Sequence, residues 1–485
     1  MWKPPQKLKY KAEAEANPGI EEARSSRWFS PVQIGQLTLA QRTWVPAMVP
    51  WRSTDEGYAT ADVIEWYARF AEGKPGAIVV EATGIRDILS GPLLRIGDDR
   101  FIPDLKKLTA AVHESSGGET KLFIQLIDFL SIRRRPPAEK YFERFLEISA
   151  EHKEKLNMEG QEDSDVRLCL SALADEELDG ILNERELEAL RMGYRERITD
   201  MEYEHIRSLP EVLPDLFANA ARRAKEAGFD GVELHYAHAY TMASFLSAKN
   251  DRNDGYGGSR ENRIRLPLEV FEKVRTKVGV DFTVGCRFLS EECIEGGSII
   301  DDALFYGVEF ARAGMDFLSL SRGGKFEDAK KPLIGWAAYP YTGKSGYECM
   351  PGYISDELGP FGRNIEPTAR IRKAIRDAGQ ETPIVVIGGI FSYQQAETIL
   401  KNGDADIVGS ARQSLADPDW FLKTSLGRGD EVRTCTFTNY CEGLDQKHKQ
   451  VTCQLWDRLD KDKTTSLSID GKRRLVAPPW QPDNN

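Results

Sequence analysis

The chain has 485 residues, of which 41% are hydrophobic, and a formal net charge of -12. Acidic and basic residues are mixed along it without a basic stripe, which argues against nucleic acid or an anionic membrane as the main partner and favours a small molecule. The N-terminus is polar, no stretch approaches the apolar length of a membrane span, and seven cysteines do not resemble a secreted disulfide framework, so we expect a cytoplasmic protein.

The order of the elements predicts an α/β fold. Residues 1–27 lack periodicity and are predicted to be an N-terminal extension. Beyond them, β-branched runs alternate with segments that carry apolar residues at helical spacing. The predicted strands are RTWVPA (42–47), AIVVEA (77–82), KLFIQL (121–126), GVELH (231–235), DFTVGCR (281–287), DFLSLS (316–321), PIVVIGG (383–389) and ADIVGSA (405–411). Eight such units predict a (β/α)8 TIM barrel over residues 28–430 rather than a doubly wound sheet.

Two connections are too long for a simple βα unit. The first, at about 127–205, is highly charged and includes a predicted helical hairpin near 175–208. The second, at about 322–365, is rich in Gly, Pro, Tyr and Trp. We expect both insertions to lie over the C-terminal mouth of the barrel, the second as a substrate cap, because barrel sites are built from the loops at that end. Residues 431–485 are expected to form a C-terminal tail.

Ring donors cluster where the fourth predicted strand ends. His235, His238 and Tyr240 fall within six residues there, and the C-terminal end of a barrel strand is where active sites are built. One isolated histidine would more often be a core or capping residue, but three donors together favour catalysis. In an alternative, a metal-dependent hydrolase, the two histidines would bind zinc. That reading needs further ligands at other strand ends, and the remaining histidines lie elsewhere.

Small residues and an arginine follow the last two predicted strands. Gly388 and Gly389 end the seventh, and Ala411 and Arg412 follow the eighth. Small residues let backbone N–H groups approach an anion and a guanidinium adds a fixed charge, so this pair of strand ends predicts a phosphate cradle.

Two further polar residues lie near strand ends and are predicted to face the same mouth. They are Gln125 on the third strand and Arg287 on the fifth. A buried arginine needs an electron-rich partner, which for Arg287 is either a neighbouring carboxylate or the pyrimidine edge of a flavin.

Three separated segments resemble the Old Yellow Enzyme family of FMN-dependent ene-reductases. They are WFSPVQIGQLTLAQRTWVPAM, GFDGVELHYAHAYTMASFLSAKNDRNDGYGGSRENR and IVVIGGIFSYQQAETILKNGDADIVGSARQSLADPDWF. The resemblance covers about residues 28–425 and is nearest the branch that contains 2,4-dienoyl-CoA reductase and trimethylamine dehydrogenase, without the C-terminal reductase domain of that branch.

The resemblance implies roles for individual residues. His235 and His238 would hydrogen-bond a substrate carbonyl oxygen, and Tyr240 would protonate the α carbon. The expected FMN-binding residues are Ala47, Met48, Ala82, Gln125, Arg287, Gly388, Gly389, Ala411 and Arg412.

The tail departs from the pattern of that branch. Cys435, Cys441 and Cys453 occupy three of the four ligand positions of its iron-sulfur motif, and Thr438 occupies the other. Since four thiolates normally hold a [4Fe-4S] cluster, we expect free thiols and no metal here.

The resemblance implies an FMN-dependent oxidoreductase that transfers hydride between reduced flavin and the activated C=C bond of an enone, enoate or enoyl thioester. Two alternatives stay open: a flavin-dependent amine dehydrogenase or demethylase that cleaves a C–N bond, and a flavoprotein subunit for electron transfer. Electrons would come from NAD(P)H or from a redox partner protein, and assembly into a homo-oligomer is left open.

Overall fold

The computed structural model describes residues 16–88, 91–238, 240–292, 296–323, 333–335, 361–438, 440–445, 447–464 and 466–481. Most of the second predicted insertion lies outside these residues, and so does the substrate cap expected there. Residues 1–15 of the predicted N-terminal extension lie outside them as well.

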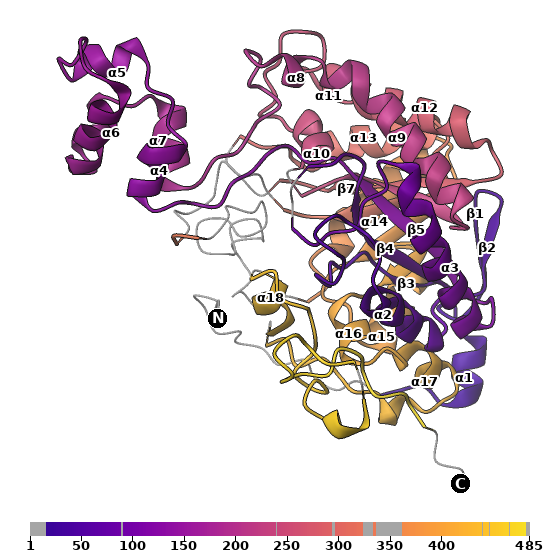
Figure 1. The fold of residues 1–485 in the computed structure, drawn as a ribbon. Helices are drawn as coiled ribbons and strands as arrows, with labels where there is room; N and C mark the ends of the chain where they lie inside the picture. The colour runs from indigo at the N-terminus through magenta and orange to yellow at the C-terminus, as the bar shows by residue number, and fades with distance from the viewer. Residues whose placement is uncertain are drawn as a thin grey trace.

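Eight parallel strands close into a barrel in the order β10-β3-β4-β5-β6-β7-β8-β9 (Figure 1). They are β3 (Thr43–Val45), β4 (Ala77–Gly84), β5 (Lys121–Ile127), β6 (Gly231–Tyr236), β7 (Thr283–Leu289), β8 (Leu318–Ser321), β9 (Ile384–Ile387) and β10 (Ile407–Gly409). Each coincides with one predicted run, so the (β/α)8 barrel is confirmed. A hairpin of β1 (Val32–Ile34) and β2 (Leu37–Leu39) precedes the first barrel strand.

Helices surround the barrel (Figure 1). The longer ones are α2 (Ala61–Glu72), α3 (Ile102–Ser116), α9 (Leu209–Glu226), α12 (Arg265–Val278), α13 (Ile300–Arg312), α14 (Ile365–Asp377) and α15 (Tyr393–Asn402). Short helices are α1 (Ile20–Ser25), α8 (Glu204–Arg207), α10 (Thr241–Leu246), α11 (Arg260–Arg263), α16 (Arg412–Ala416), α17 (Trp420–Ser425) and α18 (Tyr440–Asp445). Among the described residues, no helix is both long and apolar enough to cross a bilayer.

Helix α2 illustrates why these segments are helical. The Thr60 side chain caps it by accepting a hydrogen bond from the Val63 N–H, which satisfies one of the free donors of the first turn. Val63, Trp66 and Phe70, at helical spacing, are buried against the barrel. The amphipathic pattern in the sequence therefore fixes which face of the helix packs inward.

An aromatic layer fills the interior of the barrel. The rings of Trp44, Phe123 and Phe317 contact one another with centroids 5.2–5.4 Å apart, and all three are fully buried. Glycine is required beside them, because a Cβ at Gly231 would lie 2.6 Å from Phe123 and one at Gly285 would collide with Phe317. This packed layer fills the barrel below its C-terminal mouth, the end at which barrel sites are built.

The first insertion forms a helical lobe with its own core (Figure 1). Its helices are α4 (Ala138–Arg144), α5 (Ala150–Lys155), α6 (Asp163–Ala172) and α7 (Glu184–Arg191). Tyr141, Phe142 and Leu170 are among its core residues. The base of the lobe lies at the mouth, whereas α4 to α7 project away from the barrel (Figure 1).

Two buried arginines bind the C-terminal tail to the barrel. The Nη2 of Arg52 donates to the carbonyl oxygens of Val451 and Leu475, both at 2.7 Å, and its guanidinium lies 4.4 Å from the centroid of the Trp66 ring. Arg69 pairs with Asp419 and donates from Nε to the carbonyl of Ala477 at 3.1 Å. The tail therefore packs as an integral part of the fold.

We expect Arg52→Ala to detach part of the tail. A hydrogen bond from a charged donor contributes roughly 1.5–3 kcal/mol, so losing two of them should lower the free energy of unfolding by roughly 3–6 kcal/mol. Urea unfolding measures the loss, and limited proteolysis measures exposure of the tail. Arg24→Ala, which breaks an exposed ion pair with Glu21, is the control and should change neither. An Arg52→Ala protein with wild-type stability would contradict this role.

Candidate active site

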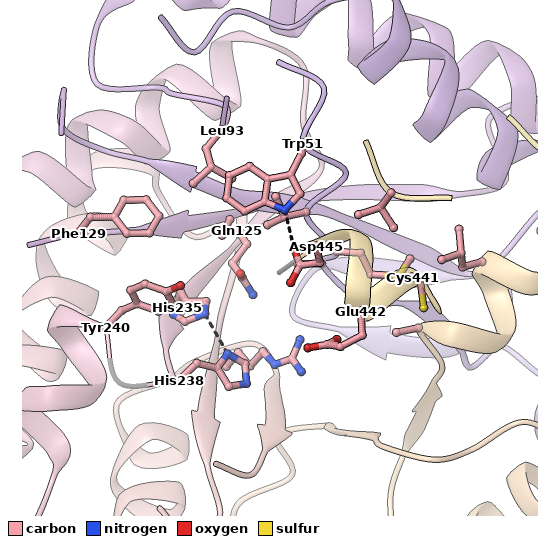
Figure 2. Close-up of a pocket in the computed structure, with 18 of the residues that line it drawn as sticks. Trp51, Leu93, Gln125, Phe129, His235, His238, Tyr240, Cys441, Glu442 and Asp445 are labelled. Carbon is pink, nitrogen blue, oxygen red and sulfur yellow. Dashed lines mark hydrogen bonds between the residues drawn. The ribbon is translucent and has the colours of Figure 1, made fainter. Parts of the chain in front are cut away.

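A cavity of about 280 Å³ opens at the C-terminal mouth of the barrel (Figure 2). Strand ends, the base of the lobe and the tail all contribute to its wall. The predicted site residues that line it are Ala47, Met48, Ala82, Gln125, His235, His238, Tyr240, Arg287, Ala411 and Arg412. The other two, Gly388 and Gly389, follow β9, which pairs with β10, but they do not line this cavity.

The three predicted ring donors meet in this cavity (Figure 2). His235 Nε2 and His238 Nδ1 lie 3.3 Å apart, and His238 Nε2 lies 2.6 Å from the hydroxyl of Ser321 at the end of β8. The Tyr240 ring stands edge-on to His235 at 5.6 Å and edge-on to Phe129 at 5.2 Å. His238 has a φ of 59°, a left-handed conformation that is uncommon outside glycine and is typical of functional sites.

Both imidazoles are held neutral. Burial, reinforced by the charge of Arg287, lowers the pKa of His235 to about 3. Burial and the same arginine also lower the pKa of His238 well below its usual value, and His235 adds to the effect. Burial and the facing Asp445 raise the pKa of Tyr240. The site therefore presents two neutral imidazoles and a protonated phenol near pH 7.

A buried polar cluster lies beside the histidines. Gln125 donates to Glu233 Oε1 at 2.5 Å, and Arg287 reaches Ser321 Oγ only at 3.4 Å. Burial raises the pKa of Glu233, opposed by Arg287. Arg287 Nε, Glu233 Oε2 and His235 Nδ1 are buried without a hydrogen-bond partner in the part of the chain that the structure describes. Buried polar groups of this kind destabilise the folded protein unless a bound molecule forms hydrogen bonds with them.

This arrangement fits a flavin. Gln125 on β5 and Arg287 on β7, the two strands that flank β6, offer N–H donors to the cavity, as the pyrimidine edge of the ring requires. Arg412 lines the cavity beyond β10, next to the end of β9. There Gly388 has a φ of 133°, and a Cβ on it would lie 2.8 Å from Asn364 Nδ2, so only glycine lets the backbone take this path.

Trp51 and the acidic residues of α18 also line the cavity, and sequence reasoning missed them (Figure 2). Trp51 Nε1 donates to Asp445 Oδ1 at 2.6 Å, and the Trp51 ring stacks on His448 with centroids 3.8 Å apart. Glu442 lies one turn earlier on the same helix. No local pattern marks these residues, because the tail reaches the mouth only through the tertiary fold.

Ser321 was also missed, although a signal for it exists. It is the last residue of β8, and its hydroxyl contacts both His238 and Arg287. A polar residue at the C-terminal end of a barrel strand is a candidate site residue on position alone.

A small cavity in the tail is lined by Cys435, Cys441 and Cys453, together with Thr438. Burial raises the pKa of all three thiols, to about 12 for Cys441 and about 11 for Cys453. Within the described ranges no set of three His, Cys, Asp or Glu side chains is arranged to hold a metal ion. That the thiols stay free of metal remains a prediction.

The barrel and its mouth define a protein of the flavin-binding TIM-barrel class. A family model described as the NADH:flavin oxidoreductase / NADH oxidase family matches residues 27–131 and 194–431, and the chain belongs to this family. Residues 132–193, which hold helices α4 to α7 of the lobe, lie outside the match.

Two relatives illustrate the range of the family. NADH oxidase from Thermoanaerobacter brockii is 27% identical over 85% of this chain and 52% of its own length. N,N-dimethylglycine/sarcosine dehydrogenase from Chromohalobacter salexigens is 27% identical over 93% of this chain and 56% of its own. The chain thus spans little more than half the length of these relatives.

Solved structures confirm the fold. A 2-naphthoyl-CoA reductase complex aligns with a TM-score of 0.64 at 20% identity, over 91% of this chain and 59% of that one. An Old Yellow Enzyme homologue from Zymomonas mobilis aligns with a TM-score of 0.53 at 22% identity, over 82% and 91%.

We expect the imidazoles of His235 and His238 to stay neutral down to pH 5. An unperturbed histidine titrates near pH 6.5 and would be mostly charged at pH 5, whereas a lowered pKa keeps the ring uncharged there. NMR of protein labelled with ¹³C in its histidine rings checks this, with the two signals identified by their loss in single His→Asn variants. Titration of either signal between pH 6 and 7 would contradict the electrostatics described above.

Proposed function

We propose that the chain is an FMN-dependent oxidoreductase that transfers hydride between reduced flavin and the activated C=C bond of an enone, enoate or enoyl thioester. The observation that carries the proposal is the meeting of His235, His238 and Tyr240 with Arg287 and Gln125 in one cavity. The flavin, when bound, supplies the hydride, and the residues of the chain bind, polarise and protonate the substrate.

The histidine pair would bind the carbonyl oxygen of the substrate. In the structure His235 Nε2 and His238 Nδ1 lie 3.3 Å apart, and a substrate oxygen entering between these two nitrogens would replace that contact. Neutral N–H donors in a buried site stabilise the negative charge that develops on this oxygen. Ser321 contacts the far nitrogen of His238 and so orients its ring.

Tyr240 would deliver the proton at the α carbon. Its ring is held edge-on by His235 and Phe129, which restricts where the hydroxyl points. Because its raised pKa keeps the hydroxyl protonated, the proton is available when the carbon becomes basic. Hydride and proton together saturate the double bond.

A second candidate is oxidation of an amine with cleavage of a C–N bond. Glu442 and Asp445 line the cavity and would favour a cationic substrate over a neutral one. Relatives include N,N-dimethylglycine/sarcosine dehydrogenase and a dimethylamine dehydrogenase from Hyphomicrobium. Anaerobic mixing separates the two candidates, because an amine would reduce oxidised flavin, whereas an enone would reoxidise reduced flavin.

We propose NAD(P)H, entering the same mouth, as the electron donor. The family is described by NADH:flavin oxidoreduction, which supports this choice. A redox partner protein is the alternative electron donor, and we further propose a homo-oligomer and a cytoplasmic location.

Replacing both His235 and His238 with alanine should remove substrate binding and keep the flavin. We expect phenol, which mimics the enolate oxygen, to bind at least about 100-fold more weakly and enone reduction to fall about 1000-fold, since preorganised donors contribute effects of this size. Titration of the flavin spectrum with phenol measures phenol binding. Steady-state rates measure enone reduction. His205→Ala, at an exposed site, is the control. Loss of the flavin itself would show that the pair serves the cofactor.

Tyr240→Phe should separate the two halves of the reaction. Without the hydroxyl we expect reoxidation of reduced flavin by an enone to slow about 100-fold, a common contribution of a general acid, while reduction by NADPH keeps its rate. Stopped-flow absorbance measures each half separately. Tyr256→Phe removes a hydroxyl that contacts Glu269 outside the cavity and should alter neither rate. Equal slowing of both halves would contradict a role in protonation.

A further inference from the structure

A second large cavity, of about 380 Å³, lies where the lobe joins the barrel. Its walls come from the lobe and from the two chain segments that lead into and out of it. Most of the residues that line it belong to the stretch outside the family match, so family membership assigns it no role. Its size falls in the range of small-molecule sites.

Aromatic rings and unpaired positive charge meet in this cavity. Tyr141, Phe145 and Tyr194 line it, and the guanidinium of Arg133 lies 5.0 Å from the centroid of Tyr194 and 5.4 Å from that of Phe145. In the described part of the chain this guanidinium forms no ion pair or hydrogen bond, so all five of its N–H donors are available to a ligand.

The second arginine, Arg134, also keeps donors for a ligand. Its Nη2 lies 3.1 Å from His448 Nδ1, and its Nη1 donates to the Gly335 carbonyl at 3.3 Å. Burial and Arg134 lower the pKa of His448 to about 4, so the imidazole is neutral and accepts this hydrogen bond. The positive charge of Arg134 is therefore not cancelled by this contact.

The other charged groups of the cavity have partners or lie at its exposed rim. Arg185 pairs with Glu188 at 2.9 Å and with Asp200 at 2.6 Å. Glu186 contacts His152 at 3.0 Å and is held by the helix cap. Glu147, Arg133 and Arg134 are all exposed, and in the described residues none of them forms an ion pair. Two guanidinium groups against one carboxylate give the cavity its preference for an anion.

The cavity adjoins the mouth of the barrel. Ile132 lines the mouth, and the next two residues along the chain line the second cavity. His448, which contacts Arg134, stacks on Trp51 in the wall of the mouth. The segments before and after the lobe pair through Ile132 and Arg195, and the Arg133 N–H donates to the Tyr194 carbonyl at 2.7 Å, which fixes the base of the lobe beside the mouth.

We propose that this cavity binds the phosphorylated adenosine of a long ligand whose reactive end reaches the barrel mouth. Aromatic rings suit stacking of the base, and guanidinium groups suit the phosphates. NAD(P)H and acyl thioesters of coenzyme A both carry such an end. The geometry of the cavity alone supports the nucleotide site. The connection of this site to the reaction depends on the function proposed above.

Binding of nucleotide fragments to the flavin-loaded full chain tests the site. Calorimetry with 2′,5′-ADP and 3′,5′-ADP should show binding, which Arg133→Gln or Arg134→Gln weakens about tenfold, the effect of losing one charged hydrogen bond. Arg144→Gln, on the same lobe but outside the cavity, is the matched control and should bind as the wild type does. The proposal is overturned if the wild type binds neither fragment. It is also overturned if both cavity variants bind the fragments as tightly as the wild type does.

Steady-state kinetics distinguish the two sources of the nucleotide. Arg133→Gln should raise the KM for NADPH if the electron donor occupies the cavity, or for an enoyl-CoA if the substrate does. The rate with a short enone after photoreduction of the flavin should not change. An unchanged KM for both ligands overturns the proposal. If the fragments bind but no enone or enoyl-CoA reoxidises the flavin, the proposed function fails and the nucleotide site stands.

Discussion

The buried guanidinium of Arg287 is the constraint on which the mouth of the barrel depends. Burial lowers the pKa of His235 and of His238, and the charge of Arg287 adds to this effect, so that both imidazoles stay neutral. Glu233 offsets the charge in part, yet burial raises the pKa of that carboxyl and Arg287 Nε keeps no protein partner among the described residues. The site is therefore built to receive an electron-rich molecule at this point.

The parts of the chain around Arg287 place that molecule at the C-terminal end of the barrel. The aromatic layer around Trp44 and Phe123 fills the interior below the mouth, and the cavity lies at the C-terminal end. The tail and the base of the lobe also line the mouth. The tail contributes Asp445, which accepts a hydrogen bond from Trp51, and the base of the lobe contributes Ile132. Arg52, which holds the tail carbonyls, ties the shape of the site to the stability of the fold.

The sequence predicts features that are local and fails for those that depend on distant contacts. Seven of the eight barrel strands contain β-branched residues, and His235, His238 and Tyr240 fall within six residues at the C-terminal end of β6. Trp51 and Asp445 are 394 positions apart, so no window of sequence pairs them. The first insertion shows helical periodicity, but that pattern does not reveal that its apolar faces pack on one another rather than on the barrel.

The most direct test of the central claim is the spectrum of the purified protein during one anaerobic cycle. We expect a yellow protein whose flavin absorbance is bleached by photoreduction and returns when an enone is added, with one saturated ketone formed for each flavin reoxidised. A protein that carries no flavin and takes up none, or a reduced flavin that an amine forms and no activated alkene reoxidises, would contradict this claim.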